Sequence, residues 1–104
     1  WTIGLGGGWT TGVIDATTNW TNVCASIANG VATVYVDGVS DATRTDTSLS
    51  IPSILPIGAY YYNGVWDSGQ SHPNSISNVS FYNRALSASE ITQNYNALKG
   101  RFNL

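Results

Sequence analysis

The chain has 104 residues, a length that suits one domain with one hydrophobic core. Charged residues make up only 10% of it and the formal net charge is -2, with the cations scattered along the sequence, so binding of nucleic acid through phosphate neutralisation is not expected. No apolar run reaches the length of a membrane span, and a single cysteine, Cys24, excludes an internal disulfide framework.

The N-terminal pattern predicts two short strands. Apolar residues alternate with small or polar ones over 1–5, and 9–14 has the same character before it ends at Asp15. Three glycines, 6–8, predict the turn between them. These glycines do not form a phosphate-binding loop, because no Gly-Lys-Ser/Thr follows and Trp9 stands where a dinucleotide fingerprint needs its last glycine.

Two tight turns organise the middle of the chain. A Trp-led strand over 20–27 leads into Asn29-Gly30, a dipeptide typical of two-residue hairpin turns because both residues tolerate positive φ. The return strand, 31–37, ends in a second such turn at Asp37-Gly38. The following residues, 40–46, are polar and predict a solvated loop.

The longest irregular stretch of the chain follows a further predicted strand. Residues 57–62 predict a strand with Tyr60 and Tyr62 on one face and Tyr61 on the other. Residues 63–75 predict a loop, and loops carry function more often than strands do.

The C-terminal stretch begins with a strand pattern and continues as a helix. Apolar and aromatic residues over 76–82 predict a core-closing strand. Ser87 with Glu90 three residues later has the spacing of a capping box, and Leu86 with Ile91 has that of a hydrophobic staple.

The helix that follows the capping box shows one apolar stripe. Ile91, Tyr95 and Leu98 recur at helical spacing, so this stripe is expected to pack against the rest of the domain while the other faces of the helix are exposed to solvent. Gly100 predicts the end of the helix, and the tail 100–104 predicts no element of its own.

Three blocks of sequence resemble the laminin-G-like, concanavalin A-like jelly-roll family. They are Trp20 with Tyr35-Val36-Asp37-Gly38, Leu49 and Ile51 with Pro56-Ile57-Gly58, and Tyr82-Asn83-Arg84-Ala85-Leu86-Ser87 with Glu90-Ile91. The resemblance implies an all-β, two-sheet antiparallel jelly-roll sandwich with one short C-terminal helix, in which Val79 and Phe81 face the core. It further implies a single domain over 1–104, or the C-terminal portion of a longer chain, because complete family domains have more strands.

Aromatic rings and polar side chains concentrate between positions 60 and 72. A flat ring can stack on the apolar face of a pyranose while amide and carboxylate groups meet its hydroxyls. The candidate carbohydrate-binding residues are Tyr60, Tyr62, Trp66, Asp67, Gln70 and His72. The structural alternative is that the tyrosines fill the two sheet faces and Trp66 covers one end of the core.

Calcium is the one cofactor that the resemblance suggests, through hard oxygen ligands at the rim of the sandwich. Asp67 and Asn63 are the candidate ligands, and a solvated turn aspartate is the alternative.

Catalysis has little support in the sequence. Glycoside hydrolysis needs two carboxylates across the scissile bond, and the chain has one glutamate, Glu90, in the capping box. A Cys–His or Ser–His–Asp arrangement stays open with Cys24 and His72, although the first lies mid-strand and the second in a loop. We therefore do not expect an enzyme, and a glycoside hydrolase is the third hypothesis.

Two hypotheses of other classes come first. One is a non-catalytic carbohydrate-binding or adhesion module of a larger surface or virion structural protein, outside the cell or on the virion, with a glycan as partner. The alternative is a purely structural phage decoration, fibre or tail component that packs against sister chains as a homo-oligomer or larger assembly. The ending over 95–102 resembles the close of laminin-G-like domains on phage structural proteins.

Overall fold

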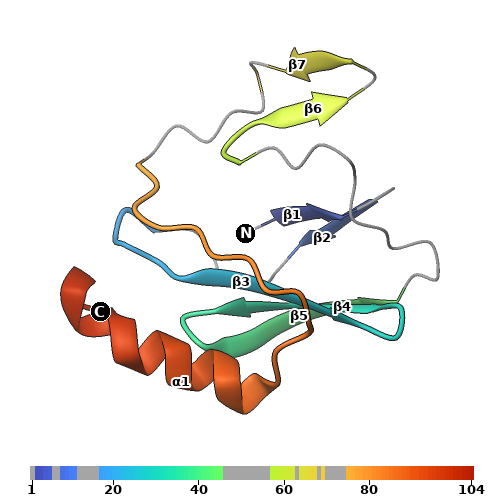
Figure 1. Ribbon diagram of the computed structural model, residues 1–104. Helices are drawn as coiled ribbons and strands as arrows, with labels where there is room; N and C mark the ends of the chain where they lie inside the picture. Colours follow the sequence, from blue (N-terminus) through green and yellow to red (C-terminus); the bar gives the residue numbers. More distant parts are fainter. Residues whose placement is uncertain are drawn as a thin grey trace. The chain divides into compact units, whose positions relative to one another are not determined.

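A computed structural model of the protein describes residues 2–5, 8–11, 17–45, 57–62, 64–67, 69 and 75–104. These residues form short antiparallel strands and a C-terminal helix (Figure 1). The chain divides into two compact units. Unit 1 consists of Trp1–Ser50 and Tyr82–Leu104, and unit 2 of Ile51–Phe81.

The first hairpin of unit 1 confirms the two predicted N-terminal strands. β1 (Thr2–Leu5) pairs with β2 (Gly8–Thr11) in antiparallel register, with Leu5 opposite Gly8. The remaining residues of the predicted turn and second strand, 6–7 and 12–14, lie outside the described part of the chain. β2 contacts β5 of the main sheet.

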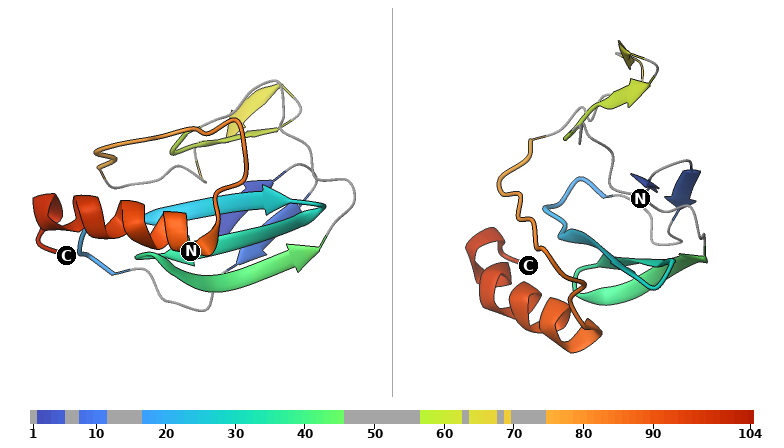
Figure 2. Two further views of the ribbon diagram at one scale, coloured as in Figure 1. Left: turned by 60° about the horizontal axis from the view of Figure 1, so that its bottom comes forward. Right: turned by 45° about the vertical axis from the view of Figure 1, so that its right-hand side comes forward.

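The main sheet of unit 1 has three antiparallel strands in the order β3-β4-β5 (Figure 2). They are β3 (Val23–Ala28), β4 (Val31–Val36) and β5 (Val39–Thr45). Both predicted turns are confirmed. Asn29 and Gly30 have φ of 50° and 74°, and Asp37 and Gly38 have φ of 50° and 80°. These left-handed values are the ones that two-residue hairpin turns require.

The predicted loop over 40–46 is wrong at 40–45, where β5 continues as a strand, and residue 46 lies outside the described part of the chain. The two-residue turn brings Val39 directly opposite Val36, so the backbone of the polar residues that follow pairs with β4. The register then shifts between Val34 and Tyr35, which places an extra residue, Asp41, in β5 as a bulge. Pairing to a central strand overrides the weak strand propensity of this segment.

The core of unit 1 is centred on β4. Ala32, Val34 and Val36 alternate onto one face of the sheet and are buried, and Tyr35 is buried on the other. Ile91 of the helix is the remaining buried hydrophobic residue among those described. The central strand is therefore covered on both faces near its end.

Helix α1 (Ala88–Leu98) begins where the sequence predicts. Ser87 is its N-cap, and the capping box with Glu90 is complete. Along the predicted stripe, Ile91 is buried, Tyr95 is half-buried and Leu98 is exposed. Among the described residues, no helix is both long and apolar enough to cross a membrane.

The predicted end of the chain needs correction. Helix α1 does not stop at Gly100 but tightens into a 3-10 turn, η2 (Lys99–Phe102), so the tail has an element of its own. The left-handed residue is Asn103, with φ of 55°, and the N–H of Leu104 donates to the carbonyl of Lys99 at 3.1 Å. Gly100 is not the cap because the 3-10 hydrogen bonds carry the chain past it.

Side-chain hydrogen bonds fasten the helical segment to the main sheet. The Thr92 hydroxyl donates to the carbonyl of Gly38 at 2.8 Å, at the turn between β4 and β5. The Ser26 hydroxyl of β3 donates to the carbonyl of Leu86, just before the helix, at 2.9 Å. One bond therefore joins α1 to the turn between β4 and β5, and the other joins the residue before its N-cap to β3.

Unit 2 contains a second short hairpin. β6 (Tyr60–Tyr62) pairs with β7 (Val65–Asp67) in antiparallel register. The predicted strand over 57–62 is thus confirmed only at its end. The predicted loop over 63–75 is wrong at 65–67, because this segment gains strand hydrogen bonds from β6.

The strand predicted over 76–82 is also wrong. These residues have no strand assignment, and no strand in the described part of the chain pairs with them. Val79 and Phe81, which were expected to face the core, are 44% and 65% exposed. An apolar pattern becomes a strand only when another strand satisfies its backbone, and no strand in the described part of the chain does so here. The described residues therefore do not confirm two facing layers at this position.

Candidate functional site

The hairpin of unit 2 presents an exposed aromatic pair. Tyr61 lies directly opposite Trp66, and residues directly opposite each other in antiparallel strands share one face. Their ring centroids are 4.8 Å apart with a tilt of 53°. Trp66 is 59% exposed and Tyr61 is half-buried. Tyr61 therefore supports the indole from one side and leaves most of its surface open to a ligand.

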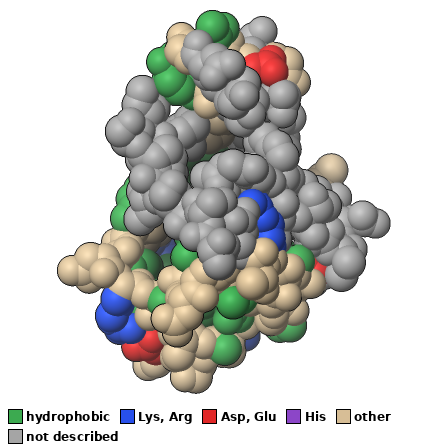
Figure 3. All heavy atoms as spheres, turned by 90° about the vertical axis from the view of Figure 1, so that its right-hand side faces the viewer, with side chains coloured by type: hydrophobic (Ala, Val, Ile, Leu, Met, Phe, Trp, Pro, Cys, Tyr) green, Lys and Arg blue, Asp and Glu red, His purple; other side chains and the backbone are tan. Residues whose placement is uncertain are grey.

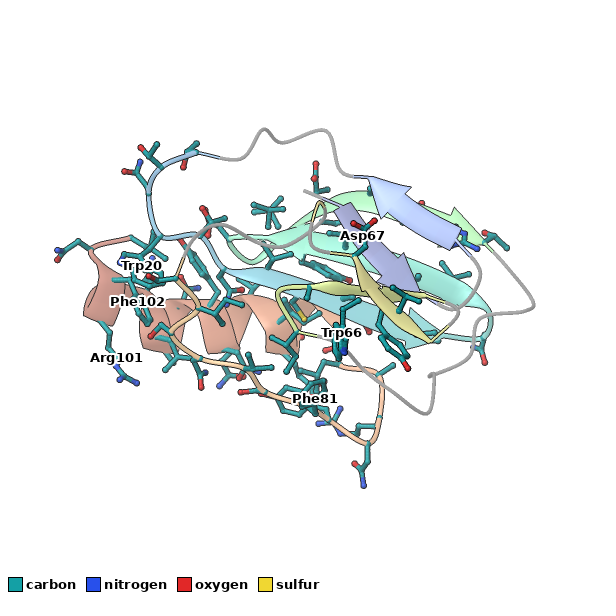
Figure 4. All side chains as sticks on the ribbon, turned by 90° about the horizontal axis from the view of Figure 1, so that it is seen from above. Trp20, Trp66, Asp67, Phe81, Arg101 and Phe102 are labelled. Carbon is teal, nitrogen blue, oxygen red and sulfur yellow. The ribbon has the colours of Figure 1, made fainter. Side chains whose placement is uncertain are left out.

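Asp67 belongs to the opposite face of the same hairpin. The register places it opposite Tyr60, and Tyr62 shares that face by alternation. Figure 4 shows Trp66 and Asp67 pointing to opposite sides of β7. The Oδ1 atom of Asp67 accepts a hydrogen bond from the N–H of Gly69 at 2.9 Å, which fixes the turn after the strand.

The hairpin therefore divides the predicted carbohydrate-binding residues between two faces. Trp66 stands on one, and Tyr60, Tyr62 and Asp67 belong to the other. Gln70 and His72 lie outside the described residues, and their assignment stays a prediction.

Tyr61 is the residue that the sequence reasoning did not place in the site. The signal was present in the dipeptide Asn63-Gly64, which is typical of two-residue hairpin turns. A hairpin at that dipeptide pairs Tyr62 with Val65, and hence Tyr61 with Trp66, as the register shows. Treating 63–75 as one loop concealed this pairing.

The predicted calcium site is not assembled by the residues that the structure describes. Among them, no three His, Cys, Asp or Glu side chains converge as a metal site would require. Asp67 is half-buried and holds Gly69, and Asn63 lies outside the described residues. Calcium at Asp67 and Asn63 therefore stays a prediction.

The single glutamate is held by neighbouring groups. Arg84 donates from both terminal nitrogens to the Glu90 carboxylate, at 2.9 and 2.8 Å, and the N–H of Ser87 donates to Oε2 at 2.9 Å. The Arg84 hydrogen bond, followed by the bond from Ser87, lowers the pKa of Glu90 to about 2. Such a carboxylate is ionised at neutral pH and is unsuited to act as a general acid.

The free cysteine is also poorly suited to chemistry. Cys24 lies in β3, half-buried and opposite Tyr35. Burial raises the pKa of its thiol, so the nucleophilic thiolate is scarce at neutral pH. The predicted partner, His72, lies outside the described residues.

The surface is in keeping with the low charge of the sequence. On the face drawn in Figure 3, the described side chains are mostly uncharged polar or hydrophobic, with few acidic or basic ones between them. Apolar side chains are also exposed in both units, including Trp20, Val39, Val65 and Trp66. The described surface therefore combines exposed rings and aliphatic side chains with neutral polar groups.

Comparison with known proteins identifies the family. A laminin G family model, described as the concanavalin A-like lectin/glucanases superfamily, matches residues 1–92. The chain belongs to this superfamily, which confirms the resemblance seen in the sequence. Its described residues are mostly antiparallel strands with one C-terminal helix, in agreement with the all-β class. No curated protein matches the chain significantly.

One solved structure resembles the chain in fold. It is residues 221–444 of an S-layer domain-containing protein from Clostridium thermocellum, with a TM-score of 0.62 and 22% sequence identity. The match covers 82% of this chain and 43% of that structure. The chain thus spans less than half the length of this relative, and the likeness concerns the fold alone.

Proposed function

We propose that the chain is a non-catalytic carbohydrate-binding module of a larger surface protein, with the Tyr61–Trp66 pair as the sugar-stacking surface. The exposed Trp66 indole, supported by Tyr61 at 4.8 Å, is the observation that carries this proposal. A flat ring with one open face suits the apolar side of a pyranose, and the cross-strand partner holds the ring in place before binding.

The absence of catalysis is part of the proposal. The superfamily name includes glucanases as well as lectins, so the family alone does not separate the two. Glycoside hydrolysis requires a protonated and an ionised carboxylic acid close together. The single glutamate is committed to Arg84 and the helix cap, which favours binding over hydrolysis.

A surface location fits the same picture. The relative of similar fold is an S-layer domain-containing protein, and the chain spans 43% of its structure. We place this chain outside the cell or on a virion, as one domain over 1–104 of a larger protein. In that domain, the antiparallel strands would form a two-sheet jelly-roll sandwich.

The experiment is glycan-array binding by wild type, Trp66→Ala and Tyr61→Ala. Trp66→Ala should weaken binding by about tenfold or more, since base–aromatic stacking of comparable area is worth about 1–3 kcal/mol. Tyr61→Ala should weaken it less, because Tyr61 acts by supporting the indole. Val65→Ala is the matched control, since Val65 is equally exposed but points to the other face.

Unchanged binding by Trp66→Ala would reject this site. The same arrays with and without a chelator test calcium, because a structural ion at Asp67 and Asn63 would make both binding and the melting temperature sensitive to EDTA.

A structural role is the second candidate, favoured by the exposed apolar residues of unit 2. Ile76, Val79 and Phe81 are all exposed within six residues. A homo-oligomer or larger surface or virion assembly would cover them, as in a decoration, fibre or tail component.

A further inference from the structure

Unit 1 carries an aromatic and basic cluster at the C-terminal turn. The ring centroids of Trp20 and Phe102 are 5.4 Å apart with a tilt of 46°. The guanidinium carbon of Arg101 lies 5.9 Å from the centroid of the Phe102 ring. Figure 4 shows Trp20 and Phe102 side by side, with Arg101 on the same turn. We call Trp20, Arg101 and Phe102 the C-terminal cluster.

Packing accounts for only part of this cluster. Phe102 is half-buried and packs against Trp20, but 44% of Trp20 remains exposed, and Arg101, whose guanidinium lies near the Phe102 ring, is exposed as well. Two local hydrogen bonds hold the segment around Trp20. The N–H of Asn19 donates to Thr17 Oγ1 at 3.2 Å, and Thr21 Oγ1 donates to the carbonyl of Asn19 at 3.3 Å. The indole is therefore presented on an ordered segment, which lowers the ordering cost of binding.

The charge at this turn is unusual for the molecule. The chain has four lysines and arginines and a net charge of -2, yet Lys99 and Arg101 both lie on η2. Arg84 is paired with Glu90, whereas no carboxylate in the described part of the chain pairs with Arg101 or Lys99. An exposed guanidinium and a partly open indole that both lie against the Phe102 ring suit a ligand that has both a carboxylate and an apolar ring face.

We propose that the C-terminal cluster binds an acidic sugar, a pyranose that carries a carboxylate, stacked on Trp20 with its carboxylate on Arg101. Nucleic acid is a poorer fit, because it would need several phosphate contacts and the turn offers two cations. This site belongs to unit 1 and is separate from the Tyr61–Trp66 pair of unit 2.

The test is affinity electrophoresis in gels containing polygalacturonate, an acidic pyranose polymer, or dextran, a neutral one. Mobility is compared with a polymer-free gel, which removes the direct effect of each substitution on charge. Polygalacturonate should retard the wild type, and added NaCl should reduce the retardation. Arg101→Gln should weaken binding by about tenfold, as expected for loss of a charge-assisted hydrogen bond. Trp20→Ala should weaken it similarly.

Arg84→Gln is the matched control, since it removes the same charge from another exposed arginine and should leave retardation unchanged. Equal melting temperatures of wild type and Arg101→Gln would show that this variant is folded. Its loss of retardation then tests the proposal even if Trp20→Ala has a folding defect. Unchanged retardation of Arg101→Gln would overturn the proposal, as would an equal loss in Arg84→Gln. If only Trp66→Ala lost retardation by polygalacturonate, the acidic sugar would be assigned to the hairpin of unit 2, and the proposal would also be overturned.

Discussion

At the scale of single residues, the turn between β4 and β5 is constrained by hydrogen bonds to two other segments of unit 1. Asp37 has φ of 50°, its N–H donates to the carbonyl of Asn22 at 2.8 Å, and its Oδ1 accepts from the N–H of Asn22 at 2.8 Å. Gly38 follows with φ of 80° and accepts from Thr92. The turn thus joins the entry to β3, the edge of β5 and helix α1.

We expect Gly38→Ala to destabilise unit 1 by about 2 kcal/mol, from a left-handed φ that alanine disfavours together with crowding. A Cβ atom at this position would lie 3.0 Å from Tyr95 Cδ1 and 3.1 Å from its Cβ. The second of these atoms is close to the helix backbone and cannot move aside. Thermal unfolding followed by circular dichroism measures the loss.

Gly100→Ala is the control for this substitution. Nothing lies within 4 Å of a Cβ atom built there, and Gly100 is in a right-handed 3-10 turn. Its melting temperature should equal or exceed that of the wild type, because alanine restricts the unfolded chain more than glycine does. Equal losses in both variants would show that Tyr95 and the φ of Gly38 are not the cause.

At the scale of elements, the start of α1 depends on the ionised state of Glu90. Bonds from Arg84 and then from Ser87 lower the pKa of Glu90 to about 2, from an ordinary value of 4.5. A carboxyl group whose pKa is lower in the folded state stabilises the fold at pH values above its unfolded pKa. This contribution is lost as the pH falls through the folded pKa. The sensitive window is therefore between pH 4.5 and about pH 2.

We expect wild type to melt at a higher temperature than Glu90→Gln at neutral pH, and the difference to shrink between pH 4.5 and about pH 2. In an NMR titration, Arg84→Gln should raise the pKa of Glu90 toward 4.5, since Arg84 is the largest cause of the shift. A pKa of Glu90 that stays near 2 in Arg84→Gln would contradict this account. Ser87→Ala should cost about 1 kcal/mol by removing the cap.

The elements that sequence reasoning predicted correctly are those with local chemistry. The turns at Asn29-Gly30 and Asp37-Gly38 need only residues that tolerate positive φ, and the capping box needs only Ser87 and Glu90 at the right spacing. Each signal lies within four residues. Two of the three blocks that carried the family resemblance contain such a signal, at Asp37-Gly38 and at Ser87 with Glu90.

The errors arose where a segment depends on a partner. The polar segment of β5 was predicted as a loop but is a strand, because β4 pairs with it. Trp66 was likewise predicted in a loop but lies in a strand, because β6 pairs with β7. The apolar segment 76–82 has the opposite outcome, with a strand pattern but no described partner. The site followed the same rule, since only the β6–β7 register shows that Tyr61, rather than Tyr60 or Tyr62, shares the face of Trp66.

At the scale of the whole molecule, the two units differ in how far their apolar side chains are buried. Unit 1 buries Val34, Val36 and Ile91 in a core. No described side chain of unit 2 is fully buried, and Phe81 is 65% exposed. Soluble monomers seldom expose large apolar side chains so close together, which is the reason to test association.

If sister chains cover 76–81, the mass measured by light scattering should rise above that of the monomer as concentration increases. The double variant Val79→Asp with Phe81→Asp should stay monomeric, because two charges would have to be buried without partners. Val39→Asp is the control, since Val39 is an exposed apolar residue of unit 1, and it should associate like the wild type. A monomer at every concentration for the wild type would reject assembly through this segment and leave sugar binding as the remaining role.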